Sequence, residues 1–222
     1  MTFRDRGDAG RRLAKALEGY GQEHPVVLAL PRGGVSVAAE VARALRAPLD
    51  LLIVRKIGLP QQPELAMGAV VDGQEPVIVR NEDVIRMAGV TDVEFAKVRD
   101  RELAEIRRRR ERYLGQRPHP ELKDRVVIVI DDGIATGATM RAALRALRKR
   151  QPRRLILAVP VAAPSILAAL REEADEVVCL ERHEGLGAIG YYYVDFDQVS
   201  DEAVMEALAA ASPPKPTTAV AP

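Results

Sequence analysis

The sequence of 222 residues lacks features that mark several classes of protein. Its single cysteine, Cys179, excludes a framework of disulfide bonds within the chain. No stretch approaches the roughly 18 consecutive apolar residues of a membrane-spanning helix, and the first residues show no apolar core of a signal peptide. We therefore expect a cytoplasmic protein without a membrane segment.

An excess of charge of one sign is also missing. The chain has 33 basic and 32 acidic residues, and the net charge of +1 gives no overall attraction to nucleic acid. His24, His119 and His183 stand alone, with no cysteine or second histidine at metal-ligand spacing. Ser36 does not lie in the Gly-x-Ser-x-Gly motif of serine hydrolases. These patterns speak against a nucleic-acid-binding protein, a histidine-cysteine metal centre and a hydrolase.

The most informative stretch begins with five apolar, β-favouring residues at 126–130. Such a run is typical of a strand that is covered on both faces, as in parallel sheets. Asp131 and Asp132 follow directly, then a run of small and hydroxylated residues, and residues 140–150 have helical periodicity with Thr139 as the expected cap. The order predicts a strand, a tight loop and a helix.

The loop in this stretch is suited to binding an anion. Its residues are Gly133, Ile134, Ala135, Thr136, Gly137, Ala138 and Thr139. Free N–H groups at a helix N-terminus beside small side chains form a phosphate site. The two acids would repel a bare phosphate, so we expect them to meet ribose hydroxyls or a divalent cation such as Mg²⁺. No Gly-Lys-Ser/Thr follows, which excludes a P-loop; an ordinary turn after a buried strand is the simpler alternative.

A second loop of similar design follows another apolar run at 26–30. It has the sequence Pro-Arg-Gly-Gly, and a predicted helix then extends to about residue 46. Gly33 and Gly34 allow the backbone to approach a ligand, and Arg32 supplies a planar cation that matches phosphate oxygens. The alternative is a glycine turn with a solvated arginine.

These motifs resemble the signature of the type I phosphoribosyltransferases, which is an apolar strand, two acids and a small-residue loop ending in Thr-Gly-x-Thr. The resemblance implies a doubly wound, mainly parallel α/β fold that binds 5-phosphoribosyl-1-pyrophosphate (PRPP). It places the 5′-phosphate on residues 133–139 and the ribose hydroxyls on Asp131 and Asp132. It also implies that these acids hold Mg²⁺, directly or through PRPP and water.

The resemblance extends to two basic segments. Residues 31–34 resemble the family's pyrophosphate loop, in which relatives often have a cis non-proline peptide; the Pro31–Arg32 bond has the matching position. Residues 49–54 predict a third strand that ends in Arg55 and Lys56, which we expect in the crevice at the carboxyl ends of the strands. These two residues are candidate catalytic and pyrophosphate-binding groups.

The sequences of these loops resemble those of adenine phosphoribosyltransferases most. Residues 57–64, rich in Gly, Pro and Gln, resemble the flexible loop that closes over the pyrophosphate. Ala135 stands where hypoxanthine-guanine enzymes have an Asp, which puts that specificity in doubt.

The segment 66–116 is longer than compact family members need, and we interpret it as an insertion over or beside the site. Residues 66–71 and 76–80 predict a β-hairpin, and residues 91–114 predict a long charged helix. Four consecutive arginines, 107–110, fit a solvated helix face, with a dimer interface or an anion-binding regulatory site as alternatives.

Residues 183–199 are interpreted as a hood near the acceptor. Tyr191, Tyr192 and Tyr193 are candidates for stacking on a base, although simple packing is as good an explanation for each. The Gly-x-Gly-x-x-Gly pattern at 185–190 is followed by residues that favour extended structure instead of a helix, which excludes dinucleotide binding.

The rest of the chain completes the alternation of strands and helices. Further strands are predicted at 154–159 and 176–180, with a turn at 160–164, and further helices at 8–20, 165–173 and about 201–211. Residues 1–211 would then form a single domain, and the proline-containing residues 212–222 a disordered tail.

The sequence thus predicts a Mg²⁺-dependent phosphoribosyltransferase that moves the phosphoribosyl group of PRPP to a nitrogen acceptor, such as a nucleobase, and releases pyrophosphate. A homodimer is common among relatives. Two alternatives stay open: a PRPP-sensing regulator without turnover, and an enzyme that uses another ribose-phosphate donor.

Overall fold

The computed structural model describes residues 2–211, so the predicted tail at 212–222 lies outside the described residues. A five-stranded parallel sheet has the order β2-β1-β6-β7-β8, and a separate antiparallel sheet has the order β3-β4-β5. The parallel strands are β1 (Val26–Ala29), β2 (Leu49–Leu51), β6 (Val126–Ile130), β7 (Arg154–Ala162) and β8 (Glu176–Arg182). The antiparallel strands are β3 (Val54–Gly58), β4 (Ala66–Val71) and β5 (Val77–Arg80).

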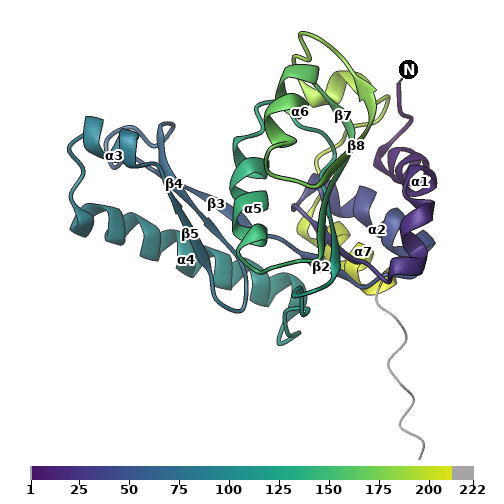
Figure 1. Cartoon of the computed structure of the whole chain (residues 1–222), viewed down its shortest axis with the longest axis horizontal. Coiled ribbons are helices and arrows are strands. Elements are labelled where there is room, and N and C mark those ends of the chain that lie inside the picture. The colour runs from purple at the N-terminus through teal and green to yellow at the C-terminus, as the bar shows by residue number, and fades with distance from the viewer. Residues whose placement is uncertain (1, 212–222) are drawn as a thin grey trace, which may run out of the picture.

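Helices cover both faces of the parallel sheet (Figure 1). One face carries α1 (Arg6–Ala16), α2 (Gly33–Leu45) and α7 (Asp201–Ala210), and the other carries α5 (Ala138–Arg148) and α6 (Pro164–Leu170). Strand β6 explains this arrangement, because Val126 and Ile128 pack in the core beneath α2 while Val127 and Val129 pack in the core beneath α5. The predicted doubly wound α/β fold is confirmed.

The pairing of β1 with β6 positions the site. These neighbours run parallel with Val27 opposite Ile128 and Ala29 opposite Ile130. The chain continues from β1 to β2 on one side and from β6 to β7 and β8 on the other. The loops after β1 and β6 therefore meet where the strand order reverses, which is where open α/β sheets bind ligands.

The antiparallel sheet, α3 (Glu82–Met87) and α4 (Asp92–Leu114) form an antiparallel lobe, residues 54–114, that extends to the left of the parallel sheet in Figure 1. The predicted hairpin and long helix are confirmed. Thr91 and Glu94 form a capping box at the start of α4, and Phe95 packs in the core. The short α3 was not predicted, because its six residues are too few to show a helical period.

The predicted single strand at 49–54 is wrong. The chain leaves the parallel sheet after Leu51 and enters the antiparallel sheet at Val54. Arg55 and Lys56 consequently lie inside β3, opposite Val70 and Ala69 of β4, and not at the carboxyl end of a parallel strand. The apolar run at 51–54 does not reveal the change of sheet, because it begins with the last residue of β2 and ends with the first residue of β3.

Other boundaries also differ from the predictions. Gly137 precedes α5 with φ 76°, and no side chain caps that helix, so Thr139 is not its cap. Strand β7 runs through Pro160 where a turn was predicted; β6 ends opposite Ala158 and β8 pairs with Val159 and Val161, so no ladder bond there needs the N–H that proline lacks.

Two short 3₁₀ helices also differ from the predictions. The predicted helix at 8–20 is α1 followed by a short 3₁₀ helix, η1 (Glu18–Glu23). A second 3₁₀ helix, η2 (Ile189–Tyr192), occupies part of the segment expected to be extended.

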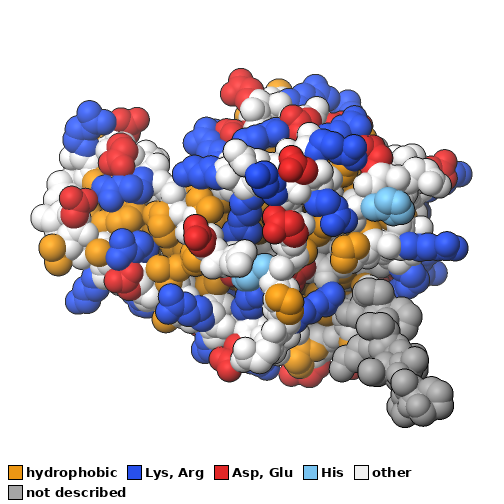
Figure 2. Space-filling view, turned by 60° about the horizontal axis from the view of Figure 1, so that its bottom comes forward, with side chains coloured by type: hydrophobic (Ala, Val, Ile, Leu, Met, Phe, Trp, Pro, Cys, Tyr) orange, Lys and Arg blue, Asp and Glu red, His pale blue; other side chains and the backbone are white. Residues whose placement is uncertain are grey.

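The surface agrees with the balanced charge of the sequence. Figure 2 shows basic and acidic side chains mixed over the body, and hydrophobic side chains gathered over the antiparallel lobe. Met87 and Val93, at this lobe, are each 79 % exposed. None of the helices within residues 2–211 is both long and apolar enough to cross a membrane.

Candidate active site

The loop between β6 and α5 forms an open cradle. Ile134 anchors it, because its N–H donates to the carbonyl of Val161 in β7 at 3.0 Å. Within residues 2–211, no hydrogen bond uses the backbone N–H groups of Ala135, Thr136 or Thr139. The loop lines a pocket of about 130 Å³ at the N-terminus of α5. Free N–H groups at a helix N-terminus suit a phosphate.

Asp131 and Asp132 come directly after β6 and line different pockets. Asp131 borders the cradle, whereas Asp132 borders a neighbouring pocket of about 390 Å³ together with Arg32 and Gly33. The Asp131 carboxylate accepts the N–H of Asp132 at 2.9 Å. Burial, and then the negative charge of Asp132, hold the pKa of Asp131 well above its ordinary value. The two adjacent acids thus line two pockets, Asp131 the cradle and Asp132 the pocket beside Arg32.

The glycine loop packs directly on these acids. A Cβ on Gly33 would overlap the Asp132 carboxylate, and one on Gly34 would lie 2.9 Å from the carbonyl oxygen of Ile130. The peptide bond between Pro31 and Arg32 is cis, as the family resemblance implies. The Arg32 guanidinium is 3.7 Å from the carboxylate of Asp201 in α7.

Arg6 is a site residue that the sequence analysis missed. Its Nε lies 2.8 Å from Oδ2 of Asp132, and its Nη1 donates to the carbonyl of Asp197 at 2.8 Å. The guanidinium also lies 3.8 Å from the centre of the Phe196 ring. No local motif marks Arg6, because only the fold brings the start of α1 to the end of β6.

The three hood tyrosines do not form one surface. Tyr193 is buried, and its hydroxyl donates to the carbonyl of Asp132 at 2.6 Å. Burial and the neighbouring acids raise its pKa, so it remains a neutral donor. The Tyr192 ring lies 4.6 Å from that of His183, whereas Tyr191 is 79 % exposed. Tyr193 thus holds the backbone of Asp132 in place, whereas the side chain of Tyr191 is exposed to solvent.

Arg55 and Lys56 lie in the antiparallel lobe. Nε and Nη2 of Arg55 are each 2.8 Å from Oε2 of Glu102 in α4. Nζ of Lys56 is 3.1 Å from both the carboxylate and the backbone carbonyl of Glu64. Across residues 2–211, neither side chain bonds to the acid pair. Their predicted roles toward a ligand stay predictions.

The acid pair has the chemistry of a partial magnesium site. Mg²⁺ prefers carboxylate oxygens and usually takes its other ligands from water and from bound phosphates. In the described part of the chain, no cluster of three or more His, Cys, Asp or Glu residues could hold a metal unaided. Asp131 and Asp132 would therefore share a cation with a ligand, and the cation would also offset their mutual repulsion.

Comparison with known proteins gives a family for this architecture. The model of the family described as "Phosphoribosyl transferase domain" matches residues 4–194. A Mycobacterium tuberculosis protein named "Putative phosphoribosyl transferase Rv0571c" is 46 % identical over 203 residues, which cover 91 % of this chain but 45 % of the relative. The chain thus spans less than half the length of that relative.

Two further proteins are similar to this chain. The crystal structure of TT1426 from Thermus thermophilus is 45 % identical, with a TM-score of 0.82, and the match covers 96 % of this chain and 100 % of that one. A uracil phosphoribosyltransferase of Lactobacillus gasseri is 34 % identical over 84 residues, or 37 % of this chain and 40 % of the relative. From the site geometry and these matches together, the chain belongs to the phosphoribosyl transferase family.

Proposed function

We propose that the chain transfers the 5-phosphoribosyl group of PRPP to a nitrogen atom of a nucleobase and releases pyrophosphate. The observation that supports this most is that the cradle, the acid pair and the glycine loop meet at the ends of β1 and β6. The similarity of part of the chain to a uracil phosphoribosyltransferase supports a nucleobase as acceptor.

In this proposal the cradle binds the 5′-phosphate through the free N–H groups of the loop, and the hydroxyls of Thr136 and Thr139 add donors. Asp131 and Asp132 accept hydrogen bonds from the ribose hydroxyls. Arg32, beside the glycine loop, binds the pyrophosphate. The sugar is thereby held with its anomeric carbon between the leaving group and the acceptor.

The lone pair of the acceptor nitrogen forms a bond to the anomeric carbon while the carbon–oxygen bond to pyrophosphate breaks, and the leaving oxygen keeps the electron pair. The proton that the acceptor loses passes to the pyrophosphate or to water. Positive charge develops on the ribose ring beside the two acids, which stabilise it electrostatically. Bound Mg²⁺ would offset the charge of the pyrophosphate. The chain supplies binding and orientation, with no covalent intermediate.

Arg6 and Tyr193 support this chemistry by holding Asp132 at two atoms. Arg6 fixes its carboxylate, and Tyr193 fixes its backbone carbonyl. An acid fixed from both sides needs little rearrangement when the substrate binds, which is how preorganised sites lower a barrier. The hood, with exposed Tyr191, provides a flat ring for an acceptor base.

The test is pyrophosphate release from PRPP with and without Mg²⁺, across purine and pyrimidine bases and simple amines. We expect Mg²⁺-dependent release with one base or a few related bases. No release with any acceptor would overturn the proposed transfer. If PRPP still raised the melting temperature, the chain would instead be a PRPP-sensing regulator.

The double variant Asp131→Asn, Asp132→Asn tests the roles of the acids. Loss of electrostatic stabilisation at the reacting ring typically lowers turnover by about 10²- to 10³-fold. The substitutions keep the side-chain shape and remove the repulsion between the acids, but they also remove the carboxylate that pairs with Arg6. We therefore expect a folded variant, which the melting temperature would check. Unchanged turnover in a folded variant would contradict the assignment of these residues.

A further inference from the structure

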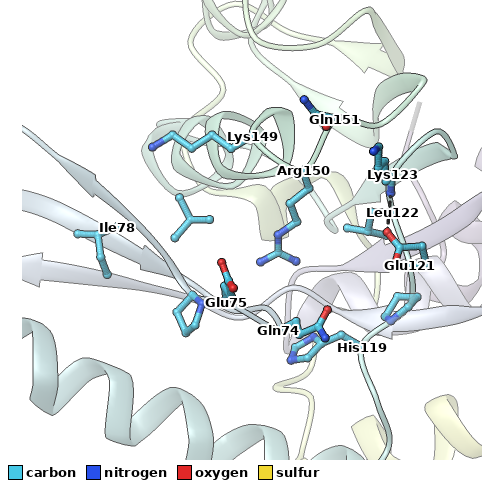
Figure 3. Close-up of a pocket in the computed structure, with 13 residues that line it drawn as sticks. Gln74, Glu75, Ile78, His119, Glu121, Leu122, Lys123, Lys149, Arg150 and Gln151 are labelled. Atoms are coloured by element: carbon cyan, nitrogen blue, oxygen red, sulfur yellow. Dashed lines mark hydrogen bonds between the residues drawn. The ribbon is translucent and has the colours of Figure 1, made fainter.

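A second cavity, of about 840 Å³, lies away from the cradle (Figure 3). Three segments line it: 74–78, which include the first two residues of β5, 119–123 before β6, and 149–151 after α5. The cradle is at the N-terminus of α5 and this cavity is at its C-terminus, about 16 Å away for an 11-residue helix. A cavity of this size matches sites for small organic ligands.

Three cations line this cavity. Figure 3 shows the guanidinium of Arg150 extending into the space between the segments. Its Nη2 donates to the backbone carbonyl of Asp72, and in the described chain no hydrogen bond uses its Nε or Nη1. Lys123 and Lys149 are exposed, and within residues 2–211 neither ammonium group has an ion pair. The cavity therefore offers donors for an anion.

The positive charge of Arg150 completes a balance with the charged groups behind it. Arg110 is 3.1 Å from a carboxylate oxygen of Asp50 and 3.1 Å from one of Asp72. Burial and the charge of Arg110 lower the pKa of His119 to about 4, so that ring is neutral at pH 7. Arg110 carries one positive charge against the two carboxylates, so Arg150 balances the second. The unused Nε and Nη1 of Arg150, together with Lys123 and Lys149, remain as donors for an anion in the cavity.

The remaining lining residues suit the rest of a nucleotide. Glu75 and Glu121 supply carboxylates, and Gln74 and Gln151 supply amides, all suited to ribose hydroxyls and base edges. The apolar part of the lining consists of Pro76, Val77, Ile78, Pro120 and Leu122. Figure 3 shows Ile78 on the strand side of the cavity, away from Lys123. Cationic, polar and apolar surfaces thus lie in one space.

We propose that this cavity is a second ligand site that binds a nucleoside 5′-monophosphate, with the phosphate at Arg150 and the base against the apolar surface of β5. The site is separate from the proposed PRPP site and requires no turnover. Because α5 joins the two sites, a ligand here contacts the same helix whose N-terminus forms the cradle.

The experiment measures binding of AMP, GMP and UMP by calorimetry, with ribose 5-phosphate and inorganic phosphate as further probes. The variant Thr139→Glu places a carboxylate at the cradle and blocks phosphate there, so that only the second site is measured. We expect one equivalent of at least one nucleotide to bind this variant. Ribose 5-phosphate and inorganic phosphate should bind at least about tenfold more weakly, because they lack the base.

The second variant adds Lys123→Ala and Lys149→Ala to Thr139→Glu. Both lysines are exposed, so the fold is expected to survive, and affinity should fall by about tenfold or more as charge-assisted contacts are lost. The matched control adds Lys15→Ala and Lys97→Ala, two exposed lysines outside the cavity. No nucleotide binding to Thr139→Glu, equal losses in both lysine variants, or inorganic phosphate binding as tightly as the nucleotides would overturn the proposal.

Discussion

Asp132 is the residue on which most contacts of the candidate site converge. Its carboxylate pairs with Arg6, its carbonyl accepts a hydrogen bond from the Tyr193 hydroxyl, and its N–H donates to the carboxylate of Asp131. Gly33 is small because this carboxylate occupies the place of a side chain. The geometry of Asp132 is thus fixed by residues from both ends of the chain.

Replacement of Arg6 tests whether this positioning matters. Arg6→Gln removes the charge that fixes Asp132, and we expect kcat/KM for PRPP to fall by about tenfold or more, as for loss of a charged hydrogen bond. Arg6→Lys should recover only part of the lost kcat/KM, because an ammonium group lacks the planar guanidinium that reaches both Asp132 and Asp197. Steady-state kinetics with Arg11→Gln, on the same helix, as control would check this; equal effects of Arg6→Gln and Arg11→Gln would refute it.

His119 gives the protein a defined pH dependence. Its pKa falls to about 4 in the folded chain through burial and Arg110, against about 6.5 when unfolded. The unfolded state therefore binds more protons between these values, and His119 makes the fold less stable as pH falls from 7 to 4. Partial exposure screens the effect, which we place on the order of 1 to 2 kcal/mol.

Urea unfolding of the wild type and of His119→Gln at pH 7, 5.5 and 4.5 would measure this contribution. Burial raises the pKa of nearby Asp72, which acts in the opposite direction, so the difference between the two proteins is the informative quantity. The wild type should lose stability relative to His119→Gln as the pH falls. A constant difference across the three pH values would argue against a neutral His119.

At the scale of elements, β3 shows how a single run of sequence serves two sheets. Residues 49–51 belong to the parallel sheet, and Val54–Gly58 to the antiparallel one. Lys56 therefore stands on the antiparallel lobe, where it bonds to Glu64 in the connection to β4. If that connection closes over pyrophosphate, Lys56 would leave the exposed carboxylate of Glu64 and pair with the more highly charged pyrophosphate.

Lys56→Ala tests this element. We expect the KM for PRPP to rise by about tenfold, which corresponds to about 1.4 kcal/mol, while the melting temperature stays close to that of the wild type because the Lys56–Glu64 pair is largely exposed. Lys97→Ala in α4 is the control. An unaltered KM for PRPP in Lys56→Ala would show that β3 and its loop do not act on the donor.

At the scale of the whole molecule, Arg110 joins the two sheets. It lies in α4 of the antiparallel lobe and pairs with Asp50 of β2 and with Asp72 at the end of β4. The four-arginine run is thus not a uniform solvated face, since Arg110 is turned inward while Arg108 and Arg109 pair with Glu105. A buried network of this kind connects the lobe to the core.

Arg110→Met would leave two buried carboxylates without their cation. We expect unfolding free energy to fall by about 3 to 5 kcal/mol, as for other broken buried pairs. The triple variant with Asp50→Asn and Asp72→Asn added should recover part of this loss, and exposed Arg107→Met should change little. Thermal and urea unfolding of the four proteins measure these effects; a loss below about 1 kcal/mol for Arg110→Met would contradict them.

The sequence by itself determined the parts of the site that are local. A run of buried β residues, two acids and a small-residue loop lie together along residues 126–139, and the backbone that they favour produces the cradle wherever the strand is placed. The same holds for the glycine loop after β1 and for the capped helix α4. Local propensity and hydrophobic periodicity specify such units without knowledge of distant contacts.

Only the tertiary structure decided which distant residues join these units. Arg6 and Tyr193 reach Asp132, and Phe196 packs on Arg6, because α1 and the hood pack beside the end of β6. The departure of Arg55 and Lys56 into the antiparallel lobe, and the inward turn of Arg110, depend equally on long-range packing. Such contacts arise from burial and charge pairing between segments far apart in the chain, and no local pattern in the sequence encodes them.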